Sequence, residues 1–131
     1  MYKQICLILI SVWIIPNLDW QVYLDMFPSA RAMAYCESGS KSNPMGNPKA
    51  LNPKDTDGLP AKGLLQFKQR TFDSWAKLIE LVDINGEPVN ADIKNPLHQI
   101  IVFRWAEENN LLRHWGCLRK LQRGDMAFLF Y

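Results

Sequence analysis

The sequence predicts a mainly α-helical fold with little or no β-strand and one long loop. Apolar residues recur at helical spacing in several stretches, and these stretches begin or end at residues that cap helices. The loop, residues 39–62, holds three Gly, four Pro, three Asn and two Ser and shows neither helical nor strand periodicity. The chain has 131 residues, which is enough for one domain with a single hydrophobic core.

Residues 1–17 differ in composition from the rest of the chain. Lys3 precedes an uncharged, mostly apolar run over residues 5–15, and Pro16 ends it. A short apolar run behind one positive charge is typical of a secretory signal peptide and is shorter than the ~20 residues that span a bilayer. Small residues spaced for cleavage first occur at 30–34, so a retained membrane anchor and a buried first helix are alternatives. We expect export, to the periplasm, the cell envelope or the outside, with residues 18–131 as the functional domain.

The first two expected helices lead to Glu37. Apolar residues four apart predict a short helix over 18–26. Ser29 can cap a second helix, because good helix formers follow it and Gly39 would close it. Glu37 then lies in the last turn, where the helix dipole disfavours negative charge and so raises the pKa of its carboxyl.

The other expected helices follow the long loop. Thr71 can cap an amphipathic helix. Asn95-Pro96 combines a capping residue with a first-turn proline and predicts a helix that ends at Asn109. His98 is expected on the solvent face of that helix. Residues 111–121 are expected to form a last, shorter helix.

Two of the three cysteines form a candidate pair. Cys6 lies in the export segment, which leaves Cys36 and Cys117. In an oxidising compartment they can form a disulfide that closes a loop of roughly 80 residues and stabilises the fold by about 4 kcal/mol. Two buried free thiols are the alternative. The chain has no Cys-x-x-Cys or His-x-x-x-His spacing, and residues 55–58 lack the flanking acids of a calcium loop, so we expect no metal and no cofactor.

Glu37 is the strongest functional candidate. It lies in Tyr35-Cys36-Glu37-Ser38-Gly39, where an apolar run stops, and Gly63-Leu64-Leu65-Gln66-Phe67 follows the long loop. An apolar wall disfavours the charged form of a carboxyl and raises its pKa, so the group can donate a proton near neutral pH. The pattern therefore suggests a general acid in a partly dry cleft that cuts a sugar–sugar bond, with the loop as one wall.

Residues from about Trp20 to Leu121 resemble the lytic transglycosylase domain of the lysozyme-like superfamily. The specific matches are the 36–39 and 63–67 segments, and weaker matches are Phe27-Pro28, Asn43-Pro44, Asn52, Thr71-Phe72 and Asn95-Pro96. The resemblance implies a lysozyme-like fold with the long loop lining the cleft. It also implies these roles: Glu37 as catalytic acid, Ser38 as support for the helix end, Asn52 and Gln66 as contacts to an acetamido sugar, and Phe67 on the groove floor.

The chain departs from the family pattern at two places. Many members carry Tyr-Asn-Ala-Gly near the end of the domain, where this chain has residues 113–117. His114 or Trp115 would have to replace the family's Tyr, and Trp115 is therefore a further candidate for substrate contact. Gln99 stands where the family usually has Asn.

The implied substrate is the glycan strand of bacterial peptidoglycan. Glu37 would act alone as general acid and then base at the β-1,4 bond between N-acetylmuramic acid and N-acetylglucosamine, leaving a 1,6-anhydro end. A hydrolytic muramidase, with Asp55 or Asp57 directing water, is one alternative, although an Asx turn is the preferred interpretation of these acids. A non-catalytic cell-wall-binding module is another. The formal charge of +2 is too small to imply nucleic-acid binding, and a monomer is expected.

Overall fold

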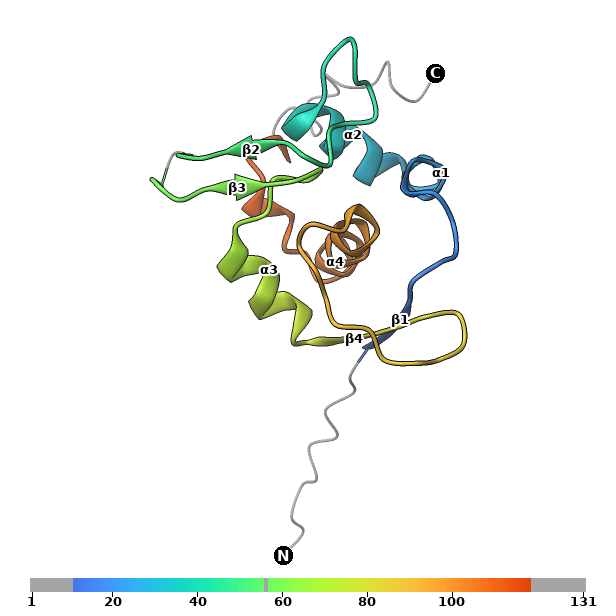
Figure 1. The fold of residues 1–131 in the computed structure, drawn as a ribbon. Helices are drawn as coiled ribbons and strands as arrows, with labels where there is room; N and C mark the ends of the chain where they lie inside the picture. Colours follow the sequence, from blue (N-terminus) through green and yellow to red (C-terminus); the bar gives the residue numbers. More distant parts are fainter. Residues whose placement is uncertain (1–10, 56, 119–131) are drawn as a thin grey trace, which may run out of the picture.

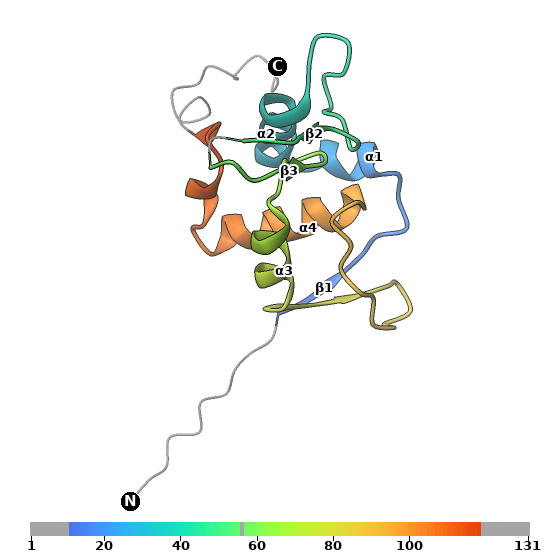
Figure 2. The ribbon, with the colours of Figure 1, turned by 60° about the vertical axis from the view of Figure 1, so that its left-hand side comes forward.

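The computed structural model describes residues 11–55 and 57–118. Helix α4 (Pro96–Glu108) lies in the middle of the domain (Figures 1 and 2). Helices α1 (Trp20–Asp25) and α2 (Pro28–Ser38) lie on one side of it, and α3 (Gln69–Ala76) lies on the other. The remaining elements are β1 (Ser11–Ile14), β2 (Leu51–Asn52), β3 (Ala61–Lys62), β4 (Ile79–Val82) and the 3₁₀ turn η1 (Leu112–His114).

The fold is mixed α/β, so the prediction of a mainly α fold with little or no strand is wrong. Strand β1 pairs in parallel with β4, with Ser11 opposite Ile79, and β2 pairs antiparallel with β3. Strands β1 and β4 are rich in β-branched and large apolar residues, which favour extended backbone. Their pairing joins segments far apart in the sequence, and β2 and β3 have two residues each, too few to show a strand period.

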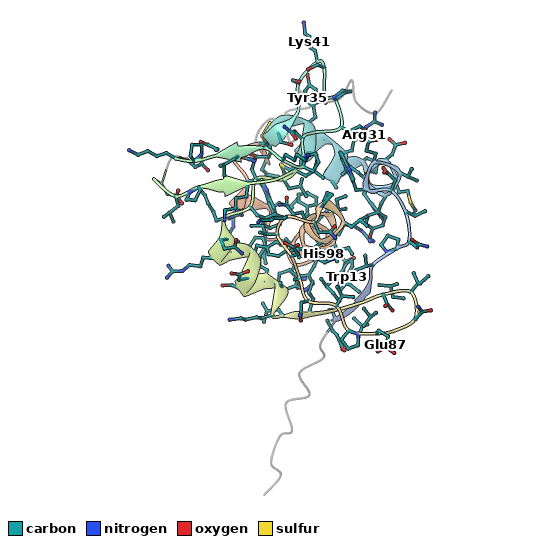
Figure 3. The ribbon with its side chains drawn as sticks, in the orientation of Figure 1. Trp13, Arg31, Tyr35, Lys41, Glu87 and His98 are labelled. Atoms are coloured by element: carbon teal, nitrogen blue, oxygen red, sulfur yellow. A yellow bond between two sulfur atoms is a disulfide. The ribbon has the colours of Figure 1, made fainter. Side chains whose placement is uncertain are left out.

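The expected export segment is described only in part. Residues 1–10 lie outside the described residues, and residues 11–14 form β1. Trp13 of this strand, labelled in Figure 3, has the guanidinium carbon of Arg104 of α4 at 5.1 Å from its ring centroid. Arg104 also lies 3.8 Å from the Phe27 ring centroid and donates a hydrogen bond to the Tyr23 hydroxyl at 2.6 Å. Among the described helices, none has the length and apolar character needed to cross a bilayer.

Helix α4 begins and ends where the sequence predicts. The Asn95 side chain accepts a hydrogen bond from the Leu97 N–H at 3.0 Å, and Asn109 caps the other end. The middle of the helix is buried on every face, as expected for a central helix. Its fully buried apolar residues are Ile100, Ile101, Val102, Phe103 and Ala106.

His98 is buried at 5% exposure, so its predicted place on a solvent face is wrong (Figure 3). The residue lies on α4, whose middle part is buried on every face. Helical spacing alone does not reveal that a helix is buried in this way. Its Nδ1 accepts a hydrogen bond from the Asp92 N–H at 2.9 Å. Burial lowers the pKa of His98, although the Asp92 charge acts in the opposite direction.

The ends of the other helices differ from the predictions. Helix α2 begins at Pro28, with Phe27 rather than Ser29 at the cap position, and closes at Gly39. A Cβ at Gly39 would lie 2.7 Å from the Tyr35 carbonyl oxygen, so close backbone approach explains the glycine. Helix α3 begins at Gln69, two residues before the predicted cap Thr71. In the stretch 111–121, where one helix is expected, the structure has the 3₁₀ turn η1. Residues 119–121 lie outside the described residues.

Candidate functional site

Glu37 is the penultimate residue of α2 and is half-buried. Cys36, the residue before it, forms a disulfide with Cys117, with an S–S distance of 2.02 Å and Cα atoms 6.1 Å apart. These are the two cysteines that the sequence singles out. The end of α2 is therefore joined covalently, next to the candidate acid, to the segment that follows η1.

Ser38 joins the two sequence motifs in space. Its Oγ donates a hydrogen bond to the Leu64 carbonyl at 2.6 Å and accepts one from the Asn47 N–H at 2.9 Å. Leu64 belongs to the 63–67 segment, and Asn47 belongs to the loop between α2 and β2. One hydroxyl group thus holds the end of α2 against both the segment and the loop.

Gln99 of α4 anchors the 63–67 segment from another side. Its Oε1 accepts a hydrogen bond from the Leu65 N–H at 2.8 Å. Its Nε2 donates to the Ile93 carbonyl at 2.6 Å and to the Lys62 carbonyl at 3.1 Å. The sequence shows Gln99 only as a departure from the family pattern, although an amide inside an apolar helix is a signal that it satisfies buried backbone groups.

Gly63 allows Gln99 to come this close. Its φ is +78°, and a Cβ at this position would lie 2.2 Å from the Gln99 Nε2. A side chain would therefore be strained by the backbone conformation and would also displace the amide. Glycine is required here by both conditions.

Replacing Gln99 by Leu is expected to lower the free energy of unfolding by about 3 kcal/mol, because a buried N–H and two carbonyls would lose their partner. Urea denaturation followed by circular dichroism measures this loss. Gln21→Leu is the control, because Gln21 is exposed on α1 and its side chain makes no hydrogen bond within the described residues. Equal stabilities of the two variants would contradict an anchoring role for Gln99.

Gln66 has a left-handed backbone, with φ +52°. Its Nε2 donates to the Ala50 carbonyl at 3.2 Å and to the Gly63 carbonyl at 2.9 Å. Both partners are acceptors, so the nitrogen must face them and the carbonyl oxygen is the atom left for a ligand. This Oε1 accepts no hydrogen bond from a described residue.

The other predicted substrate contacts, Asn52, Phe67 and Trp115, differ in how far they are exposed. Asn52 is exposed on β2. Phe67 is fully buried and Trp115 is 3% exposed, so their rings lie in the core and offer no surface to a sugar. The Trp115 Nε1 donates to the Leu65 carbonyl at 2.7 Å, which gives this residue a part in holding the segment. Aromatic neighbours of Phe67 are Phe72, Trp75, His114 and Trp115.

The His114 ring is inclined by 26° to the Phe67 ring, with centroids 6.3 Å apart. Burial lowers the pKa of His114, and the nearby Lys68 charge acts in the same direction. Asp55 and Asp57 oppose this shift. The imidazole therefore favours its neutral form and belongs to the aromatic cluster.

Asp55 and Asp57 both form ion pairs with one lysine. The Lys68 Nζ lies 2.9 Å from the Asp55 Oδ2 and 2.8 Å from the Asp57 Oδ1. The Asp57 Oδ1 also accepts a hydrogen bond from the Leu59 N–H at 3.0 Å, which confirms the predicted Asx turn. The hydrogen bond from Lys68 lowers the pKa of Asp57 and keeps it a carboxylate.

Comparisons with protein-family models, curated proteins and solved structures return no match for this chain. Within residues 11–55 and 57–118, no three His, Cys, Asp or Glu side chains are grouped so that they could hold a metal ion.

Proposed function

We propose that this protein is a peptidoglycan lytic transglycosylase in which Glu37 is the only general acid and base. The observation that carries the proposal is the hydrogen bond from the Ser38 hydroxyl to the Leu64 carbonyl, at 2.6 Å. It brings the end of α2, which carries the half-buried residue Glu37, against the segment that carries the Gln66 amide. An acid at a helix end that is joined to a segment with a free amide oxygen suits an acetamido sugar, whose N–H needs an acceptor.

In the proposed reaction, the Glu37 carboxyl protonates the oxygen of the glycosidic bond, and the bond from the anomeric carbon to that oxygen breaks. The sugar is left as an oxocarbenium-like species, which its own acetamido oxygen stabilises. The Glu37 carboxylate then takes the proton of the C6 hydroxyl, and that oxygen attacks the anomeric carbon. Glu37 returns to its protonated form, and no water is consumed.

The ion pairs of Asp55 and Asp57 support this reaction over hydrolysis. A hydrolytic muramidase would need a second carboxylate to direct water. The two acids that the sequence suggests for this role are both held by Lys68, between the β2–β3 connection and the start of α3. A reaction that needs only one carboxyl group therefore fits the described residues better.

Digestion of purified sacculi tests the proposal through the masses of the released muropeptides. We expect 1,6-anhydro ends, which are lighter than hydrolysis products by one water molecule. Reducing ends would instead make the protein a muramidase. Binding to sacculi without any soluble product would favour a cell-wall-binding module.

A further inference from the structure

A groove lined by three lysines lies beside the 63–67 segment. It has a volume of about 380 Å³, and its lysines are Lys49, Lys62 and Lys94. We call it the lysine groove. The other residues that line it are Pro48, Ala50, Leu51, Gly63 and Ile93.

The positive charge of the lysine groove is not neutralised by its surroundings. No carboxylate is among the described residues that line it. The ammonium groups of Lys49 and Lys94 form no ion pair within the described part of the chain. The Lys62 Nζ has an uncharged partner, the Gln69 Oε1, at 3.3 Å.

The acids closest in sequence to the residues of the lysine groove are Asp55, Asp57 and Asp92. Asp55 and Asp57 bind Lys68, as described above. The Asp92 Oδ1 accepts a hydrogen bond from the Lys94 backbone N–H at 2.9 Å, which is a local turn contact. Among the described residues, three lysines against the single unpaired carboxylate of Asp92 leave the groove with net positive charge over a partly apolar surface.

Gly63 connects the lysine groove to the candidate site. It lines the groove, and its neighbour Leu64 carries the carbonyl that Ser38 binds. The Gly63 N–H also donates to the Ala50 carbonyl at 2.7 Å, and Ala50 lines the groove too. A group attached to a glycan bound beside the 63–67 segment could therefore reach the lysines.

We infer that the lysine groove binds the carboxylate-bearing peptide attached to the glycan strand. Lysines pair with carboxylates, and Leu51, Ile93 and Pro48 suit the small apolar side chains of a short peptide. An uncharged sugar would leave the charge of the lysines unpaired, and a polyphosphate would make no use of the apolar residues. The inference rests on the proposed function, because the peptide must be carried by a glycan at the site.

The test compares two glycan fragments of equal length, one carrying its peptides and one stripped of them. Binding to the Glu37→Gln variant is measured by calorimetry, so that cleavage does not interfere. Adding Lys49→Gln and Lys94→Gln should weaken binding of the peptide-bearing fragment about tenfold and leave the stripped fragment unchanged. The difference should shrink as the salt concentration rises from about 0.05 to about 0.5 M.

The matched control adds Arg70→Gln and Lys77→Gln, which remove the same charge from exposed cations outside the groove. An equal loss with this control, or an equal loss for both fragments, would overturn the inference. Unchanged binding of both fragments by the groove variant would also overturn it. Failure of the proposed function appears separately, as an absence of cleavage products when the unmodified protein digests sacculi.

Discussion

Replacing Glu37 by Gln should lower the release of soluble fragments from sacculi by about 10²- to 10⁴-fold, the contribution of a positioned general acid or base. Glutamine has nearly the same shape, but its amide is not acidic enough to transfer a proton to the glycosidic oxygen. Binding to sacculi should change little, because the amide can still accept and donate hydrogen bonds. Turbidity of a sacculus suspension measures the release, and a pull-down assay measures the binding.

Glu108→Gln is the control for the loss of one negative charge, since Glu108 is exposed at the end of α4. It should release fragments at the rate of the unmodified protein. Both variants should unfold at temperatures close to that of the unmodified protein. If Glu37→Gln still releases fragments at more than about a tenth of the normal rate, Glu37 is not the proton donor.

The double substitution Cys36→Ala and Cys117→Ala should lower the free energy of unfolding by about 4 kcal/mol, because the unfolded chain regains the freedom that a large closed loop removes. For a domain of this size, such a loss corresponds to a fall of roughly 15 °C in Tm. Differential scanning calorimetry measures it. Because Cys36 precedes Glu37, cleavage should also decline at temperatures where the variant remains folded.

The unmodified protein with and without reductant provides the control for the disulfide. Reductant should lower its Tm by a similar amount and raise its mass by two hydrogens, and it should leave the double variant unaffected. Two free thiols would instead give one Tm under both conditions. That result would contradict the bond between Cys36 and Cys117.

Local signals in the sequence predict the helices better than the strands. The start of α4 depends on Asn95 and Pro96, which act on neighbouring backbone groups, and the structure confirms it. Strand β1 depends on a partner at residues 79–82, which residues 11–14 do not reveal by themselves. The β2–β3 pair lies within a stretch whose Gly and Pro content indicates a loop.

In the candidate site, too, the sequence predicts local motifs better than long-range contacts. The sequence pairs the Glu-Ser-Gly motif with the Gly-Leu-Leu-Gln motif, and the bond between Ser38 and Leu64 joins them. The sequence does not distinguish an aromatic residue in a groove from one in the core, and Phe67 proves to be buried. The partners of Gln99 lie at residues 62, 65 and 93, and only the folded chain brings them together.

The attachment of the 63–67 segment to three separate parts of the chain limits how the proposed enzyme could acquire new substrates. Ser38, Gln99 and Trp115 each hold a backbone group of this segment or of its immediate neighbour. A sugar that binds there would meet a wall that is already in position, and little ordering would be needed on association. Substitutions that change substrate choice should therefore accumulate in the exposed loop at residues 40–44, where side chains can vary without breaking these bonds.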